Sequence, residues 1–184
     1  SLQAIYGTGL HWIVMLAPIG LVFFLAARVH RLKASTAQSL FWVYSGLMGL
    51  SLAYVFVAYT GESVARVFFI TAGTFAGLSL FGYTTKRNLS GMGSFLIMGV
   101  IGLLIAMVVN IFLESSALQF GISVLGVLIF AGLTAYDTQK IKSIYVENDG
   151  TAVAEKKAIM GALTLYLDFI NMFIFLLHLF GNRE

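Results

Sequence analysis

Cysteine is absent from this 184-residue chain, and its one proline is Pro18. Without cysteine, the protein can hold no disulfide, thiolate metal site or cysteine nucleophile. Charge is also scarce: Asp, Glu, Lys and Arg make up 10% of the residues, against roughly 25% in ordinary soluble domains. The basic residues form short clusters and no stripe interleaved with aromatic residues, which argues against nucleic acid as a partner.

Apolar side chains dominate what is present, because 59% of the residues are hydrophobic and the mean hydropathy is +0.93. Between its charges the sequence predicts six helical spans, each near the ~20 residues that cross about 30 Å of hydrocarbon. The spans cover residues 10–29, 37–59, 65–84, 92–113, 117–138 and 158–180. Only helices satisfy their own backbone groups across such lengths in lipid. We therefore expect one all-α polytopic bundle over residues 1–184, with the lipid bilayer as its partner.

The charges between the spans predict the orientation of the chain. Clusters of Lys and Arg follow the first, third and fifth spans, and such clusters mark cytoplasmic loops. They are Arg28, Arg31 and Lys33; Lys86 and Arg87; and Lys140, Lys142, Lys156 and Lys157. This pattern places residue 1 and the C-terminus on the external side. The chain starts without Met and shows no signal peptide, so we expect an upstream span and seven spans in the full-length protein.

Two features predict how the helices pack and connect. Glycines three or four residues apart predict packing seams, because small residues allow close approach of transmembrane helices. The pairs are Gly46 and Gly49, Gly73 and Gly77, and Gly99 and Gly102. The connection 143–157 is polar and mixed in charge, and we expect a mobile cytoplasmic loop there.

The last span holds a single charged residue, Asp168, near its middle. An acid costs several kcal/mol in hydrocarbon by most estimates, so it is usually kept for an ion pathway, a partner or a proton. Steps of three and four residues place a set of small and polar residues on the same helix face. That face contains Gly161, Thr164, Asp168, Asn171, Phe175 and His178. Polar groups avoid lipid, which predicts that this face turns inward and that the last helix is central.

The fifth span ends with a second acid, Asp137, which shares a helix face with Thr134. If Asp137 approaches Asp168, the two carboxyl groups cannot both ionise cheaply, and they titrate as a unit with a shared proton. Straight, parallel helices would leave the acids ~10 Å apart in depth, which tilt or unequal helix starts can absorb in part. The spacing permits this pair and equally permits Asp137 to be an interfacial acid near Lys140.

Two segments resemble the C-terminal signature of the transmembrane Bax-inhibitor-motif family, in its bacterial branch. They are 135–141, Ala-Tyr-Asp-Thr-Gln-Lys-Ile, and 165–173, Leu-Tyr-Leu-Asp-Phe-Ile-Asn-Met-Phe. The resemblance extends from about residue 17 and is strongest after Gly121. It implies seven helices, a central last helix and a pH-sensitive calcium leak in the bacterial inner membrane. It also implies a proton-sharing pair at Asp137 and Asp168, with an arginine latch on the first acid. Arg28 matches the latch best, and Arg31 is the alternative.

The leading hypothesis is therefore a passive calcium or cation leak that passes the two acids, whose carboxylate oxygens suit calcium as a transported or bound ion. Thr134, Thr164 and Asn171 are candidate supporting residues, with Asn171 placed to orient Asp168. We expect no cofactor and no enzymatic activity. The alternative is a non-transporting regulator that binds a membrane protease or another quality-control partner.

An intramembrane protease is disfavoured. Ser94 follows a glycine-rich helix start, and His178 is expected near the opposite membrane face, so they should form no catalytic pair. An aspartyl protease would need a Gly-Leu-Gly-Asp motif, which the chain lacks. Another polar residue, Asn110, lies in an apolar span, and we expect it to bridge helices by hydrogen bonds.

Overall fold

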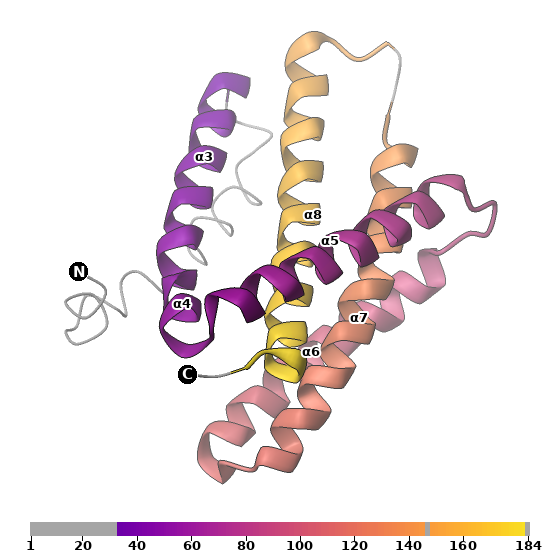
Figure 1. The fold of residues 1–184 in the computed structure, drawn as a ribbon. Coiled ribbons are helices and arrows are strands. Elements are labelled where there is room, and N and C mark those ends of the chain that lie inside the picture. Colours follow the sequence, from indigo (N-terminus) through magenta and orange to yellow (C-terminus); the bar gives the residue numbers. More distant parts are fainter. Residues whose placement is uncertain (1–32, 146–147, 183–184) are drawn as a thin grey trace. The chain divides into compact units, whose positions relative to one another are not determined.

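The computed structural model describes residues 33–145 and 148–182, and the elements in these ranges are helices (Figure 1). Five stretches among them are long and apolar enough to cross a membrane: Ser35–Ala58, Gly61–Thr84, Ser90–Leu113, Ser116–Ser143 and Val153–Phe180. They correspond to the second through sixth predicted spans, which confirms the all-α membrane architecture. The first predicted span, 10–29, lies outside the described residues, as do Arg28 and Arg31, so a sixth span stays a prediction.

The chain divides into two compact units. The described part of the first contains α3 (Ala34–Ser51), the 3-10 helix η2 (Leu52–Tyr54), α4 (Val55–Ala58) and the beginning of α8 (Thr151–Phe180) up to Leu163. The second contains α5 (Gly61–Thr84), α6 (Ser90–Leu113), α7 (Ser116–Ser143) and the rest of α8. Both candidate acids belong to the second unit.

In the first unit, α8 begins at Thr151, within the predicted loop 143–157. The prediction of a loop up to Lys157 was therefore wrong. Lys157 Nζ donates to Asp149 Oδ2 at 2.6 Å, which joins the first turns of the helix to the residues before it. The ion pair lies at the polar start of α8, where the helix extends to residues that precede its apolar part.

Local signals fix the helix ends in the second unit. The Thr60 side chain accepts a hydrogen bond from Ser63 N–H and caps α5, and Ser115 caps α7 by accepting from Leu118 N–H. Such caps satisfy amide groups that the first helical turn leaves without partners. Between α6 and α7, Glu114 adopts the left-handed conformation with φ 49°. This residue ends α6 and allows a connection of two residues to α7.

Close contacts hold the four helices of this unit together. A Cβ atom at Gly82 of α5 would overlap the backbone of Ala135 on α7, and one at Gly93 of α6 would overlap the ring of Tyr136. Leu103, Ile122 and Phe175 form a buried cluster that joins α6, α7 and α8. The Ala135 backbone and the Tyr136 ring occupy the space that these glycines leave, so α5 and α6 lie directly against the part of α7 that carries Asp137.

Most of the predicted glycine seams make no contact within the described residues. Cβ atoms placed at Gly46, Gly49, Gly73, Gly77 and Gly102 would meet no atom of residues 33–145 and 148–182 within 4 Å, and among the predicted residues only Gly99 is packed, against Ile129. Within the helices, the glycines at closest approach are Gly82, Gly93, Gly126 and Gly132, and no two of them are three or four residues apart. The spacing of glycines identifies a helix face that allows close packing. Which glycine contacts a neighbouring helix depends on where the two helices cross.

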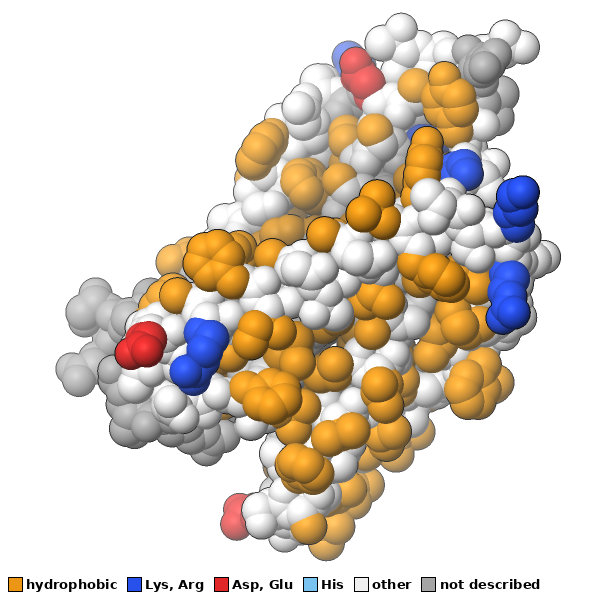
Figure 2. Space-filling model, turned by 45° about the vertical axis from the view of Figure 1, so that its right-hand side comes forward, with side chains coloured by type: hydrophobic (Ala, Val, Ile, Leu, Met, Phe, Trp, Pro, Cys, Tyr) orange, Lys and Arg blue, Asp and Glu red, His pale blue; other side chains and the backbone are white. Residues whose placement is uncertain are grey.

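The outer surface is strongly apolar. Figure 2 shows hydrophobic side chains spread over the visible face, with few charged groups between them. Large apolar side chains on α6 are among the most exposed, including Phe95 at 69%, Ile111 at 70% and Phe112 at 83%. A surface of this kind is stable against lipid and would aggregate in water.

Candidate functional site

Asp137 of α7 and Asp168 of α8 lie side by side in the second unit. Their carboxyl groups are close enough to interact with each other, and only 8% and 4% of the two residues is exposed. No N–H or hydroxyl group of the described residues donates to the buried Oδ2 of Asp168. Asp137 is therefore the polar partner that α7 brings to the acid of α8.

The stagger of the antiparallel helices α7 and α8 makes this meeting possible. Phe175 lies about one and a half turns from the end of α8, yet it packs against Gly126, about three turns from the start of α7. Phe175 also stacks on Phe130, with ring centroids 6.0 Å apart. The turn between α6 and α7 accordingly lies beyond the end of α8 in Figure 1. The unequal helix ends absorb much of the depth difference expected from counting residues.

Aromatic contacts with α5 hold α8 beside the acids. Phe169, which follows Asp168, meets Phe68 and Phe75 edge to face at centroid distances of 5.6 and 5.4 Å. Phe173, one turn later, meets Phe68 at 6.2 Å. Such pairs add about 0.5–1.5 kcal/mol each to the area they bury. They fix the rotation of α8, and with it the direction of the Asp168 side chain.

The predicted supporting residues lie within about one turn of the acids along α7 and α8, and two of them bond within their own helices. Thr134 is fully buried, and its hydroxyl donates to the Phe130 carbonyl at 2.8 Å. The Asn171 amide donates to the Leu167 carbonyl at 2.8 Å, a bond that does not orient Asp168. Thr164 lies half-buried one helical turn before Asp168. These residues add polar groups to α7 and α8, whereas the direct polar contact between the two helices is made by the two acids.

The pair offers few ligands to a metal ion. Two carboxyl groups supply at most four oxygens, whereas calcium takes six to eight. In the ranges 33–145 and 148–182, no group of three or more His, Asp or Glu residues could hold a metal ion. An ion at this place would keep part of its water shell, which suits a passing ion better than a resident one.

The residues of the disfavoured protease do not meet. Ser94 is exposed near the start of α6, in the turn that packs on Tyr136 through Gly93. His178 lies near the end of α8, where its ring is 6.4 Å from that of Tyr59. The start of α6 and the end of α8 are opposite ends of the second unit. Ser94 and His178 are therefore far apart within the second unit, and the absence of enzymatic activity stays a prediction.

Polar residues at the two ends of the unit fix its helix connections. Asn110 Oδ1 accepts from Ser115 N–H at 3.0 Å and Nδ2 donates to Gln119 Oε1 at 3.5 Å, so it bridges α6 and α7 as predicted. Sequence reasoning missed Gln139, whose amide accepts from Leu89 N–H at 2.9 Å and donates to the Arg87 carbonyl at 2.7 Å. Gln139 lies in the polar end of α7, between Thr138 and Lys140, where an amide side chain does not stand out in the sequence.

Comparison with known proteins agrees with this architecture. A family model described as "Inhibitor of apoptosis-promoting Bax1" matches residues 1–184. An uncharacterized protein of Caulobacter vibrioides is 54% identical over 179 residues, which cover 96% of this chain and 72% of that protein. RP147 of Rickettsia prowazekii, also uncharacterized, is 50% identical over 97% of this chain and 76% of its own length. The inner membrane protein YbhL of Escherichia coli is 48% identical over 93% of this chain and 74% of its own. The chain belongs to the Bax inhibitor-like family of membrane proteins.

Proposed function

We propose that the protein is a pH-sensitive passive leak for calcium or other cations, gated by Asp137 and Asp168. The observation that carries this proposal is the side-chain contact between the two buried acids on neighbouring membrane helices. Buried acids in membrane spans are costly and are usually retained for ion or proton pathways. The resemblance to the Bax-inhibitor-motif family implies the same activity.

Chemistry links the contact to pH. Two carboxyl groups can form a hydrogen bond with each other only when one carries a proton, and two ionised groups at this distance repel. Loss of the proton therefore weakens the attachment of α8 to α7. A calcium ion replaces that proton as a positive bridge between carboxylates. Proton and cation thus compete for one place, and the helix arrangement responds to both.

The family resemblance adds a latch by Arg28, with Arg31 as the alternative, on the carboxylate of Asp137. A guanidinium would stabilise the ionised form of that acid and hold one helix arrangement. The inner-membrane relative and the basic connections support a bacterial inner-membrane location with the C-terminus outside.

The test is calcium flux into liposomes that contain the purified protein, measured over a pH series with an enclosed calcium dye. The combined variant Asp137→Asn and Asp168→Asn should lose the pH dependence of the flux. A matched control, Glu62→Gln with Glu155→Gln, also removes two acids, but these are exposed and lie outside the pair, and it should behave as the native protein.

Native flux and pH response in the Asn variant would refute the proposal. Absence of flux from the folded native protein, together with co-purification of a membrane protease in a fixed ratio, would replace it with the regulator hypothesis.

A further inference from the structure

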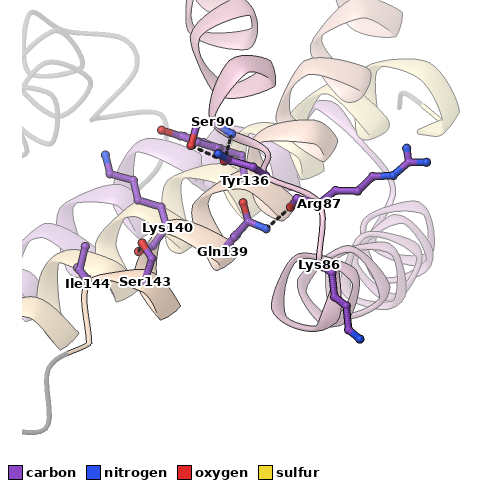
Figure 3. A pocket seen from close by; sticks show the side chains of 9 residues that line it. Lys86, Arg87, Ser90, Tyr136, Gln139, Lys140, Ser143 and Ile144 are labelled. Atoms are coloured by element: carbon purple, nitrogen blue, oxygen red, sulfur yellow. Dashed lines mark hydrogen bonds between the residues drawn. The ribbon is translucent and has the colours of Figure 1, made fainter.

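A polar pocket of about 560 Å³ lies where the ends of α5 and α7 meet the start of α6. Three of its lining residues are cations, Lys86, Arg87 and Lys140, and none is an acid. Figure 3 shows that their charged ends extend in different directions around Tyr136 and Gln139. The charges therefore border the opening instead of converging on one point, which suits a bulky anionic group better than a single small ion.

These cations are available to a ligand. All three are exposed, and within the described residues none has a carboxylate at salt-bridge distance. Asp137, the acid closest along the chain, is buried and does not line the pocket. The pocket thus has a positive border in which no cation forms a salt bridge with the described residues.

The base of the pocket is preorganised. Gln139 bonds the main chain of Arg87 and Leu89, so the α5–α6 connection is fixed while the Arg87 guanidinium stays outside this interaction. The Tyr136 ring is fixed by its packing against Gly93. The start of α6 at Ser90 also lines the pocket, and the positive end of its helix dipole favours an anion there.

Exposed apolar side chains beside the pocket indicate that the anionic group belongs to a lipid. Phe81 on α5 and Phe95 on α6 are 50% and 69% exposed, and each lies about one and a half turns from a lining residue. Apolar surface for acyl chains therefore begins next to a cationic pocket at the ends of three membrane helices. The positive-inside rule predicts that this end faces the cytoplasm. Basic pockets of this kind between membrane helices bind acidic lipid headgroups.

We propose that this pocket binds the phosphate of an anionic phospholipid, with Lys86, Arg87 and Lys140 around the headgroup and the acyl chains on the exposed faces of α5 and α6. The proposal is independent of the ion leak, because it uses none of the acids.

The test counts bound phosphatidylglycerol by native mass spectrometry of the purified protein in detergent, with phosphatidylcholine as the neutral comparison. The pocket variant combines Arg87→Gln with Lys140→Gln, which leaves the main-chain bond of Arg87 to Gln139 in place. The control variant combines Lys33→Gln with Arg66→Gln and removes two exposed positive charges elsewhere. Circular dichroism and size-exclusion chromatography check that both variants fold.

Each cation near an anionic lipid contributes about fivefold to affinity. The pocket variant should therefore bind phosphatidylglycerol about 25-fold more weakly, while the control and native protein bind it alike and prefer it to phosphatidylcholine. Equal loss in both variants, or no preference in the native protein, would overturn the site. Full displacement of the lipid by millimolar inorganic phosphate would overturn the lipid assignment and indicate a soluble phosphate ligand.

Discussion

Gly82 on α5 and Ala135 on α7 meet backbone to backbone, so that a Cβ atom at Gly82 would overlap the Ala135 carbonyl group. Ala135 lies two residues before Asp137, and this contact therefore sets the distance of α5 from the acid pair.

Gly82→Ala should destabilise the protein, because the methyl group must push two backbones apart. Overpacking of this kind costs typically 1–3 kcal/mol. Gly77→Ala on the same helix is the matched control, because a Cβ there meets nothing within 4 Å. It should leave stability unchanged or raise it slightly, since alanine favours helix over glycine by about 1 kcal/mol. Thermal unfolding in detergent measures both. Equal melting temperatures for the two variants would contradict the close approach.

Gln139→Met should open the connection between α5 and α6. The substitution removes both hydrogen bonds of the amide while keeping the length of the side chain. Leu89 is buried, so leaving its N–H without a partner costs about 1–3 kcal/mol, whereas the bond to the Arg87 carbonyl is exposed and its loss costs less. Hydrogen exchange at the Leu89 amide should become faster by more than tenfold. Gln38→Met, at an exposed position on α3, is the control and should leave that amide protected.

Asp137→Asn and Asp168→Asn should have effects on the pH response that do not add. An asparagine donates a hydrogen bond to the remaining acid whether or not that acid is protonated, so either single variant alone should flatten the response. The combined variant should then add little, as expected for two groups that act as a unit. Calcium flux in liposomes at several pH values measures all three. Two independent, additive losses would show that the acids work separately.

The cost of a lone acid in an apolar span singled out Asp168, and Asp137 was its possible partner. Spacing left that pairing open, and the family resemblance supplied it. The sequence also predicted that Asn110 bridges two helices, because an amide group in a membrane span needs a hydrogen-bond partner. Most of the predicted glycine seams make no contact within the described residues. Gly73 and Gly77 have the favoured spacing, but packing depends on where two helices cross, which spacing within one helix does not encode.

The axial offset between α7 and α8 could not be predicted from the sequence either. Helix lengths counted from charges placed Asp137 and Asp168 in different layers, whereas the contact of Phe175 with Gly126 moves α7 past the end of α8. Residues that bond to main-chain groups, such as Gln139, also leave little trace in the sequence, because any backbone can serve as their partner.

Orientation can be tested directly because the chain lacks cysteine. A single cysteine introduced as Glu62→Cys should react with a membrane-impermeant maleimide added to intact spheroplasts. Lys86→Cys, at the other end of α5, should react only after the membrane is permeabilised. Both positions are exposed, so accessibility and not burial decides the result. The reverse labelling pattern would invert the predicted topology.

The contact between Asp137 and Asp168 depends on the axial register of α7 against α8. A slide of one helix along the other by a single turn is about 5.4 Å, more than the reach of any hydrogen bond. Phe175 would at the same time leave Gly126, the glycine that makes room for its ring. The contact of the two acids and the contact of Phe175 with Gly126 therefore both require the same axial register of α7 against α8.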